Sequence, residues 1–200
     1  MKLQKEFYRQ HDVVKLAREL LGKVIFTFIN GQYTAGIISE TEAYAGAIDK
    51  ASHAFGGRRS NRTEVMFAAG GVAYIYLCYG IHHLFNVVTG PEGTPHAVLL
   101  RGIFPREGIE IMMERRKVKL GKTFSSGPGT ASSALGLKSN MSGTDLSGNT
   151  IWIEDLKFKV PENEIYIGPR IGVDYAAEHA ALPYRFLIKK DIFPPLGRQI

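Results

Sequence analysis

The chain has 200 residues, a length that one domain with a single hydrophobic core accommodates. Its apolar content of 44% and charged content of 22% are ordinary for a soluble globular protein, which excludes a disordered or fibrous chain. The net charge of +6 favours anionic partners, although charge alone does not identify nucleic acid as the partner.

The first elements in chain order are a short helix and a hairpin. Residues 13–21 have the apolar spacing of an amphipathic helix, with Asp12 placed to cap it and Gly22 placed to end it. Two strands follow at 24–29 and 32–42, and the Asn-Gly pair between them is typical of a tight hairpin turn.

The middle of the chain predicts more strands. Residues 72–79 and 84–88 have the pattern of a second hairpin that turns at Gly80. Residues 97–104 then predict a buried strand, which one charged side chain, Arg101, interrupts.

The C-terminal half mixes both kinds of element. Residues 108–120 predict a helix, and the composition of 121–150 predicts that long loops dominate there. The remaining expected elements are strands at 151–153, 164–167 and 185–189 and a short helix at 176–181. Together these elements predict one mixed α/β (α+β) domain over residues 1–200, with a largely antiparallel, hairpin-rich sheet.

Cys78 is the only cysteine, so the chain cannot form an internal disulfide. A reducing compartment follows, and we expect a cytoplasmic protein in which Cys78 is a small core residue. The first residues lack the apolar stretch of a signal peptide, and no segment has the length and apolarity of a membrane span. We therefore expect no membrane association.

Glu40 and Glu42 stand at alternate positions near the end of the strand 32–42. Alternate strand residues share a face, so we expect Ile38, Glu40 and Glu42 on one face, with the carboxylates about 6.5–7 Å apart. A solvated face is the commoner explanation for such a pair. The strand is otherwise apolar or small and leads directly into Tyr44, so one of the carboxylates is a candidate general base.

Arg101 cannot be buried within an apolar strand without an ionic partner. Glu42 or Glu40 would supply that partner, and the arginine would then keep the glutamate ionised and help to hold a water molecule. An edge-strand arginine that reaches water along its own stem is an equally good explanation.

Aromatic residues and a basic loop complete the set of candidates. Tyr74 and Tyr76 share a strand face, and Tyr74 is interpreted as a core residue. Tyr79 falls at the hairpin tip, where an exposed ring resembles the wedge that minor-groove binders insert between base steps. His53 lies in a polar loop and could be incidental, but nearby arginines such as Arg58 suit phosphate groups.

His82 and His83 do not predict a metal site, because adjacent strand residues point to opposite faces. The sequence has no zinc-binding spacing and no phosphate-binding glycine loop. Metal-free hydrolysis without a cofactor is therefore the better enzyme hypothesis.

Short blocks spread along nearly the whole chain carry a family resemblance. They are Glu40-Thr41-Glu42-Ala43-Tyr44, Met66-Phe67, Tyr76 with Tyr79-Gly80, Phe85-Asn86-Val87, Val98-Leu99-Leu100-Arg101, Ser126-Gly127-Pro128 and Arg170-Ile171-Gly172-Val173. In these blocks and their order the chain resembles the alkyladenine (3-methyladenine) DNA glycosylase family of animals and bacteria.

The resemblance implies a curved, mostly antiparallel sheet with a protruding hairpin and surrounding helices. It implies an enzyme that flips alkylated or deaminated purines out of duplex DNA and hydrolyses the N-glycosidic bond, leaving an abasic site. The implied lesions are of the 3-methyladenine, 7-methylguanine, hypoxanthine and ethenoadenine class. The implied partner is damaged double-stranded DNA, no cofactor is implied, and a monomer is the default.

The resemblance also implies roles at matching positions. Glu42, rather than Glu40, matches the base that activates the attacking water, and Arg101 matches the arginine that positions this water. The positions that match residues enclosing the flipped base are Tyr44, His53, Tyr76 and Asn86. Of these, Asn86 matches a pocket residue that crowds the exocyclic amine of a normal guanine. Tyr79 matches the side chain that enters the gap left by the flipped nucleotide, and Arg58 is a candidate DNA contact.

One departure lies after Gly127-Pro128, where the family often has a lysine and a leucine and this chain has Thr130 and Ala131. A phosphate contact or the local packing at Thr130 and Ala131 is therefore expected to differ from that of the family.

Two other functions stay open from the residues. Glu40 and Glu42 have the separation of an inverting sugar O-glycoside hydrolase, roughly 6.5–9.5 Å, although Trp152 is the only tryptophan available for a sugar cleft. A non-catalytic DNA-damage binding protein is the second alternative.

Overall fold

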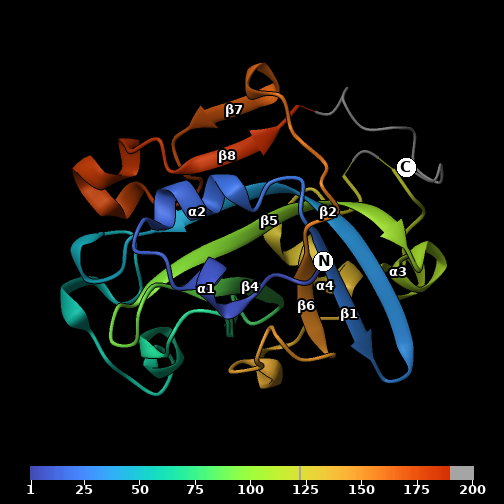
Figure 1. Cartoon of the computed structure of the whole chain (residues 1–200), viewed down its shortest axis with the longest axis horizontal. Helices are drawn as coiled ribbons and strands as arrows, with labels where there is room; N and C mark the ends of the chain where they lie inside the picture. The colour runs from blue at the N-terminus through green and yellow to red at the C-terminus, as the bar shows by residue number, and fades with distance from the viewer. Residues whose placement is uncertain (122, 190–200) are drawn as a thin grey trace.

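The computed structural model describes residues 1–121 and 123–189 (Figure 1). The α-helices are α1 (Lys5–Tyr8), α2 (Val13–Glu19), α3 (Ile109–Arg116) and α4 (Pro128–Leu135). The 3-10 helices are η1 (Gly46–Ile48), η2 (Phe55–Gly57), η3 (Glu64–Phe67), η4 (Ser139–Met141), η5 (Glu162–Glu164) and η6 (Asp174–Ala181). The strands are β1 (Val24–Ile29), β2 (Gln32–Tyr44), β3 (Ala73–Cys78), β4 (His82–Thr89), β5 (His96–Glu107), β6 (Ile151–Glu154), β7 (Ile165–Gly168) and β8 (Arg185–Ile188).

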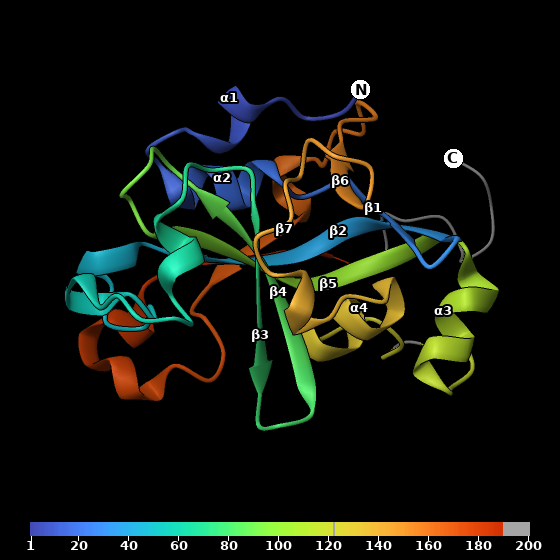
Figure 2. The same cartoon turned by 90° about the horizontal axis from the view of Figure 1, so that it is seen from below.

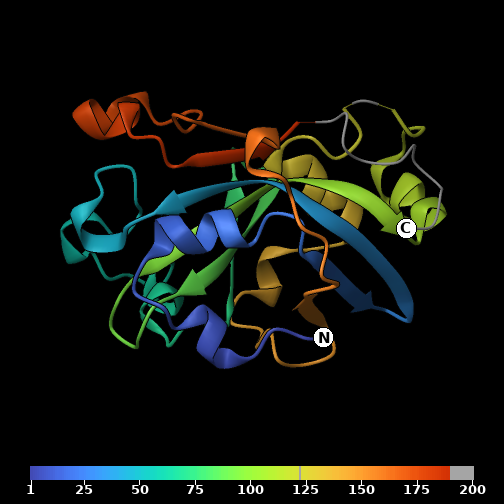
Figure 3. The same ribbon diagram turned by 45° about the horizontal axis from the view of Figure 1, so that its top comes forward.

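The strands form a single antiparallel sheet in the order β3-β4-β5-β2-β1-β6, and β8 pairs with both β2 and β7. The long strands β2 and β5 lie at its centre and curve strongly along their length (Figure 3). The expected mixed α/β fold with a curled, mostly antiparallel sheet is therefore confirmed.

The main core lies between the sheet and the helices α2 and α4. Leu16 and Leu20 of α2 and Leu135 of α4 are fully or almost fully buried, together with sheet residues such as Ile25 and Val98. The side chain of Asp12 accepts a hydrogen bond from the backbone N–H of Lys15, so the expected cap of α2 is confirmed.

Helix α4 was not expected, and the prediction that loops dominate 121–150 is wrong at this helix. Pro128 stands at its first turn and Gly136 ends it with a φ of +74°, which are ordinary helix boundary signals. Its small residues Ala131, Ser132 and Ala134 are buried against β4 and β5. Serine and glycine suggested a loop here, whereas close packing against the sheet needs small side chains in a helix.

Helix α3 is shorter than the expected 108–120. It ends at Arg116, because Lys117 adopts a left-handed conformation with a φ of +54°. The hydrophobic spacing continues to Leu120, which packs against the main core from outside the helix.

Strands β2 and β5 each contain one extra residue near the middle. The register pairs Ile38 with Ile103, Glu40 with Gly102, Thr41 with Leu100 and Glu42 with Leu99. Ser39 of β2 and Arg101 of β5 are therefore without a partner across this ladder. Gly102 lies opposite the first bulge, where a Cβ would lie 2.9 Å from the hydroxyl oxygen of Ser39, so a larger residue would force Ser39 to shift.

The paired bulges decide which side chains face the core. Ile38 and its partner Ile103 both belong to the main core, although regular alternation would put Ile38 on the face of Glu40 and Glu42. The expectation that Ile38 shares the carboxylate face is therefore wrong, because Ser39 shifts the alternation by one residue.

The hairpin of β3 and β4 projects away from the body of the molecule (Figure 2). At its tip, Tyr79 has a left-handed φ of +51° and is 91% exposed. The protruding hairpin with an exposed tyrosine at its end is thus confirmed. Within the residues that the structure describes, no helix has the length and apolarity needed to cross a membrane.

Candidate active site

A cavity of about 400 Å³ lies where the end of β2 meets the β3–β4 hairpin and the loop before η6. The predicted residues that line it are Tyr44, His53, Tyr76, Tyr79, Asn86 and Arg101. Two larger hollows, of about 680 and 670 Å³, lie elsewhere and contain none of the predicted site residues. The sequence candidates therefore converge on one cavity.

Glu42 lies beneath one wall of this cavity and is completely buried. The Tyr44 hydroxyl donates to its Oε2 at 2.8 Å, and the backbone N–H of Ile171 donates to its Oε1 at 2.8 Å. Arg101 Nη1 lies 3.3 Å from the same Oε1. Tyr44, Ile171 and Arg101 all line the cavity, so the carboxylate lies directly behind its lining.

Burial raises the pKa of Glu42 above the ordinary glutamate value. The Arg101 guanidinium and the hydrogen bonds from Ile171 and Tyr44 act in the opposite direction. The carboxyl group is thus held between desolvation, which favours its protonated form, and three donors that favour its ionised form. A carboxyl group in such an environment is a candidate to exchange a proton during a reaction.

Arg101 forms ion pairs with both carboxylates of β2. Its Nε lies 3.1 Å from Glu40 Oε1, so the expectation of a glutamate partner is confirmed for Glu40 as well as for Glu42. Arg185 of β8 donates to the same Glu40 oxygen at 2.6 Å. Glu40 therefore anchors two arginines from neighbouring strands, and Arg101 is fixed from behind while its Nη1 faces Glu42.

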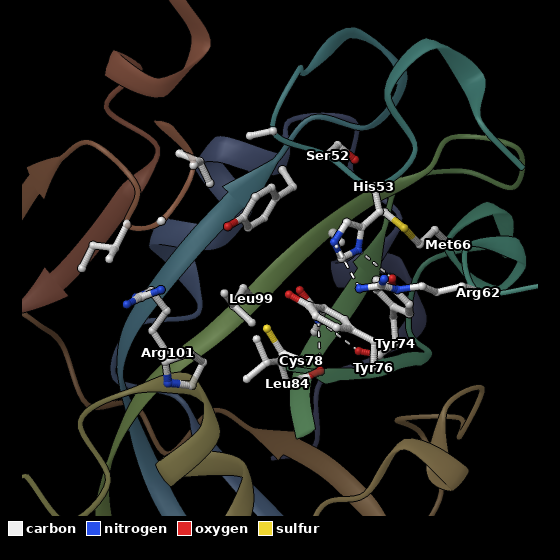
Figure 4. Close-up of a pocket in the computed structure, with 18 of the residues that line it drawn as sticks. Ser52, His53, Arg62, Met66, Tyr74, Tyr76, Cys78, Leu84, Leu99 and Arg101 are labelled. Carbon is white, nitrogen blue, oxygen red and sulfur yellow. Dashed lines mark hydrogen bonds between the residues drawn. The ribbon is translucent and has the colours of Figure 1, made fainter. Parts of the chain in front are cut away.

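The opposite wall consists of aromatic rings (Figure 4). The rings of Tyr74 and Tyr76 lie with centroids 5.4 Å apart, and His53 meets Tyr76 edge to face at 4.7 Å. His53 Nδ1 and the Tyr74 hydroxyl are joined by a hydrogen bond of 2.8 Å. Tyr74 is buried as expected of a core residue, but it also lines the cavity and orients His53.

Arg62 lies against this aromatic wall, with its guanidinium 4.7 Å from the Tyr76 ring centroid. Its Nη2 lies 3.4 Å from His53 Nε2, and since an arginine only donates, Nε2 is the acceptor and Nδ1 carries the proton to Tyr74. Burial, with the charges of Arg62 and Arg58, lowers the pKa of His53 to about 4. His53 is therefore a neutral ring at physiological pH.

Asn86 stands between the two walls on β4. It is buried, and its side-chain amide donates to the backbone oxygens of Tyr74 and Leu84 at 3.1 and 3.3 Å. Across the sheet it pairs with Leu99, which in turn pairs with Glu42. Asn86, Leu99 and Glu42 thus form one row on the cavity face of three adjacent strands.

The other candidates lie around the cavity or away from it. Arg58 is exposed at the end of η2 and is not part of the lining. Thr130 lies in the first turn of α4, where its hydroxyl donates to the Gly127 carbonyl at 2.8 Å, and Ala131 is fully buried, so local packing accommodates the departure there. His83 Nδ1 accepts a hydrogen bond from the Ser139 N–H. In residues 1–121 and 123–189, no three His, Cys, Asp or Glu side chains group as a metal site.

Sequence reasoning gave no role to Ile171 or Arg185, and it assigned Arg62 only to a basic loop that suits phosphates, although each of the three touches a candidate residue. Ile171 contributes a backbone N–H, which its side chain does not reveal. Arg185 is the first residue of β8, a position from which a charged side chain ordinarily reaches water, so the sequence carries no signal of its ionic partner.

Comparison with known proteins matches this chain over residues 6–192 to the family model described as methylpurine-DNA glycosylase. A relative from Chlamydia abortus is 48% identical and covers 93% of this chain and 97% of its own length. Relatives from Bacillus cereus and Clostridium perfringens are each 43% identical, over 93% and 96% of this chain and 95% and 98% of their own lengths. All three bear the provisional name 3-methyladenine DNA glycosylase. With the fold and the residues of the cavity, these matches show that the chain belongs to the methylpurine-DNA glycosylase family of N-glycosyl hydrolases.

Proposed function

We propose that this protein is a base-excision repair enzyme that releases 3-methyladenine and related damaged purines from duplex DNA, with Glu42 as general base. The observation that carries the proposal is the Glu42 carboxylate, which is held by Arg101 and two further donors directly beside a cavity walled by neutral rings. The provisional names of the relatives support the same substrate class.

Hydrolysis in this site would proceed at C1′ of the deoxyribose. Glu42 accepts a proton from a water molecule beside Arg101, and the water oxygen bonds to C1′ as the C1′–N9 bond breaks. The bonding electrons leave with the purine, and the transition state has oxocarbenium character at the sugar. The products are the free base and an abasic site, so no covalent enzyme intermediate is required. The Arg101 charge holds Glu42 ionised for this step.

The aromatic wall suits the leaving group. Methylation of a ring nitrogen makes the purine cationic, and the C1′–N9 bond is then already weakened because the departing base becomes neutral. Electron-rich tyrosine faces such as Tyr44 and Tyr76 attract a cation, and a neutral His53 does not repel it. A neutral base such as hypoxanthine gains no such attraction, and because it would leave as an anion it needs a proton or strong hydrogen bonds to its edge.

Access to the cavity requires that the damaged nucleotide leave the duplex. Extrusion costs a few kcal/mol, and less at a lesion that already weakens base pairing. Tyr79, at the tip of the projecting hairpin and on the cavity rim, is positioned to fill the vacated space in the base stack. Arg58, exposed beside the aromatic wall, would contact the DNA backbone.

Asn86 would give the pocket its discrimination against normal guanine. Its amide is fixed by two backbone carbonyls on the cavity face, so it cannot move away from an exocyclic amine. Ethenoadenine and 7-methylguanine complete the proposed lesion range, and the enzyme is proposed to act as a monomer.

The test is release of free base from duplex DNA containing alkylated purines or hypoxanthine, in EDTA, by the wild type and Glu42→Gln. Wild type should release base, whereas Glu42→Gln should bind the same DNA and lose at least about 1,000-fold in rate, because an amide cannot accept the proton. Wild-type rates from the variant would remove Glu42 from the mechanism. Binding without release by both proteins would favour a non-catalytic damage-binding protein.

The sugar O-glycoside hydrolase is not supported. An inverting hydrolase needs a second carboxyl group that donates a proton. Glu40 does not line the cavity, and one of its oxygens already accepts hydrogen bonds from Arg101 and Arg185, so it is not placed to donate a proton to a bound sugar.

A further inference from the structure

Arg170 lies just before Ile171, and its side chain is completely buried behind the site. Its Nη1 and Nη2 donate to the two carboxylate oxygens of Asp49, the second at 2.9 Å. Nη1 also donates to the Ala43 carbonyl at 2.9 Å, and Nη2 donates to the His179 carbonyl at 3.0 Å. One guanidinium therefore joins β2, the loop after η1 and the end of η6.

The same guanidinium also contacts two aromatic rings. Its carbon lies 4.9 Å from the Tyr44 ring centroid and 5.2 Å from that of Tyr184. Burial alone would disfavour both charges, but the hydrogen bonds between Arg170 and Asp49 outweigh it, which lowers the pKa of Asp49 and raises that of Arg170. The pair is thus fully ionised and bidentate, the most rigid geometry that an arginine offers.

Two of the three donors that hold Glu42 depend on this guanidinium. The Tyr44 ring whose hydroxyl donates to Oε2 rests against Arg170, and the N–H that donates to Oε1 belongs to the next residue, Ile171. The third donor, Arg101, is fixed separately by Glu40. Arg170 and Asp49 therefore act on Glu42 by two independent routes.

We propose that Arg170, locked by Asp49, is a positioning residue that aims the Tyr44 hydroxyl and the Ile171 N–H at Glu42. The inference rests on Glu42 being the general base. A lysine at position 170 would keep the charge, but it could not form the planar pairing with Asp49 while lying flat between two rings. The proposed role therefore depends on the planar shape of the guanidinium as well as on its charge.

The role has a kinetic signature, because the two donors favour the ionised form of Glu42. If they are misaligned, the pH at which Glu42 becomes ionised rises, and the acid side of the rate profile moves to higher pH. The other charged or titratable groups that face Glu42 are Arg101 and Glu40, with Tyr175 further away. None of them is changed by substitution at position 170.

The experiment measures single-turnover release of hypoxanthine from duplex DNA between pH 5 and 9, together with DNA affinity. Arg170→Lys should slow release about tenfold or more, since small misplacements of a catalytic group are costly. Its acid midpoint should move up by roughly one pH unit. Affinity for the lesion DNA should change less than about threefold, because Arg170 is buried away from the DNA.

Thr27→Val is the matched control for lost stability. It removes a buried hydroxyl that bonds to Thr34 at 2.6 Å and to the Leu135 carbonyl at 2.9 Å, both far from Glu42. It should lower the melting temperature and leave the acid midpoint in place. If Arg170→Lys does not fold, Asp49→Asn replaces it, because it releases Arg170 while keeping the shape of the side chain.

An acid midpoint and a rate per folded molecule equal to those of Thr27→Val would overturn the positioning role. Glu42→Gln, assayed alongside, separates this result from a failure of the proposed function. Release by Glu42→Gln at the wild-type rate would refute the general base itself. An inactive Glu42→Gln with an unshifted Arg170→Lys would refute only the role of Arg170.

Discussion

The two walls of the cavity differ in the interactions that hold their side chains in place. Behind one wall, Glu40, Glu42, Arg101 and Arg185 are cross-linked by ion pairs and barely exposed. The other wall consists of neutral rings held by edge contacts and one hydrogen bond, and the guanidinium of Arg62 lies against the Tyr76 ring. The first wall is fixed electrostatically, and the second is fixed by packing.

This difference matches the two halves of the proposed reaction. Water activation needs a carboxylate whose donors are already in place, because reorganisation during the reaction would add to the barrier. Base capture needs flat surfaces that accept several purines, and rings provide this without demanding one pattern of hydrogen bonds. The comparison predicts that substitutions in the charged wall reduce the chemical rate, whereas those in the aromatic wall change substrate preference or stability.

Among substitutions that leave Glu42 in place, the largest effect is expected for Arg101→Leu. It removes the cation nearest to Glu42, so the pKa of Glu42, already raised by burial, rises further and less carboxylate is available at neutral pH. Single-turnover base release at pH 7 should fall about 100- to 1,000-fold and recover in part as the pH is raised. A pH-independent loss would contradict the assigned role.

A smaller effect is expected for Tyr76→Leu, which removes an aromatic face but keeps an apolar one. Release of a cationic base such as 7-methylguanine should fall about tenfold more than release of neutral hypoxanthine, because only the cation loses its attraction to the ring. Rates for both lesions, measured with the same protein preparation, check this ratio. An equal loss for the two lesions would show that the wall acts by stacking alone.

The smallest effect concerns stability and His53. Its folded pKa of about 4 lies below its ordinary value of 6.5, so as the pH falls the unfolded chain takes up this proton first. Stability is therefore present above about pH 6.5 and is lost as the pH falls toward about 4. Urea unfolding at pH 7.5 and pH 5 should show a loss that is about 2 kcal/mol smaller in His53→Gln than in wild type. His96, whose pKa burial also lowers, contributes to both proteins and cancels in the difference.

The sequence predicted the hairpins, and most of its candidate site residues line one cavity, because local signals were strong. The Asn30-Gly31 turn, the capping Asp12 and the charge of Arg101 inside an apolar strand each have few structural solutions. The contacts that hold the charged wall could not be predicted from local sequence signals. Long-range partners such as Arg185 and the Ile171 N–H come from the far end of the chain, and only the pairing of β8 with β2 brings Arg185 to Glu40.

Two misses have a common physical cause. Helix α4 is composed of small residues whose propensity suggests a loop, and its stability comes from close contact with β4 and β5. The bulge at Ser39 is equally invisible in the residue pattern, because regular alternation describes Glu40 and Glu42 well and fails only at Ile38. Both the helix and the bulge are determined by tertiary packing, which local sequence patterns do not show.

The two bulges of β2 and β5 differ in what their extra residues can tolerate. Ile38 faces the core and Glu40 the opposite face, so deletion of Ser39 would leave neighbouring residues in regular alternation and turn over neither side chain. Deletion of Arg101 would likewise leave Leu100 and Gly102 in regular alternation, but it would remove the cation that pairs with both Glu40 and Glu42. Evolution can therefore shorten β2 at its bulge without loss of charge, whereas the bulge of β5 has to persist wherever the ion pairs of Arg101 are kept.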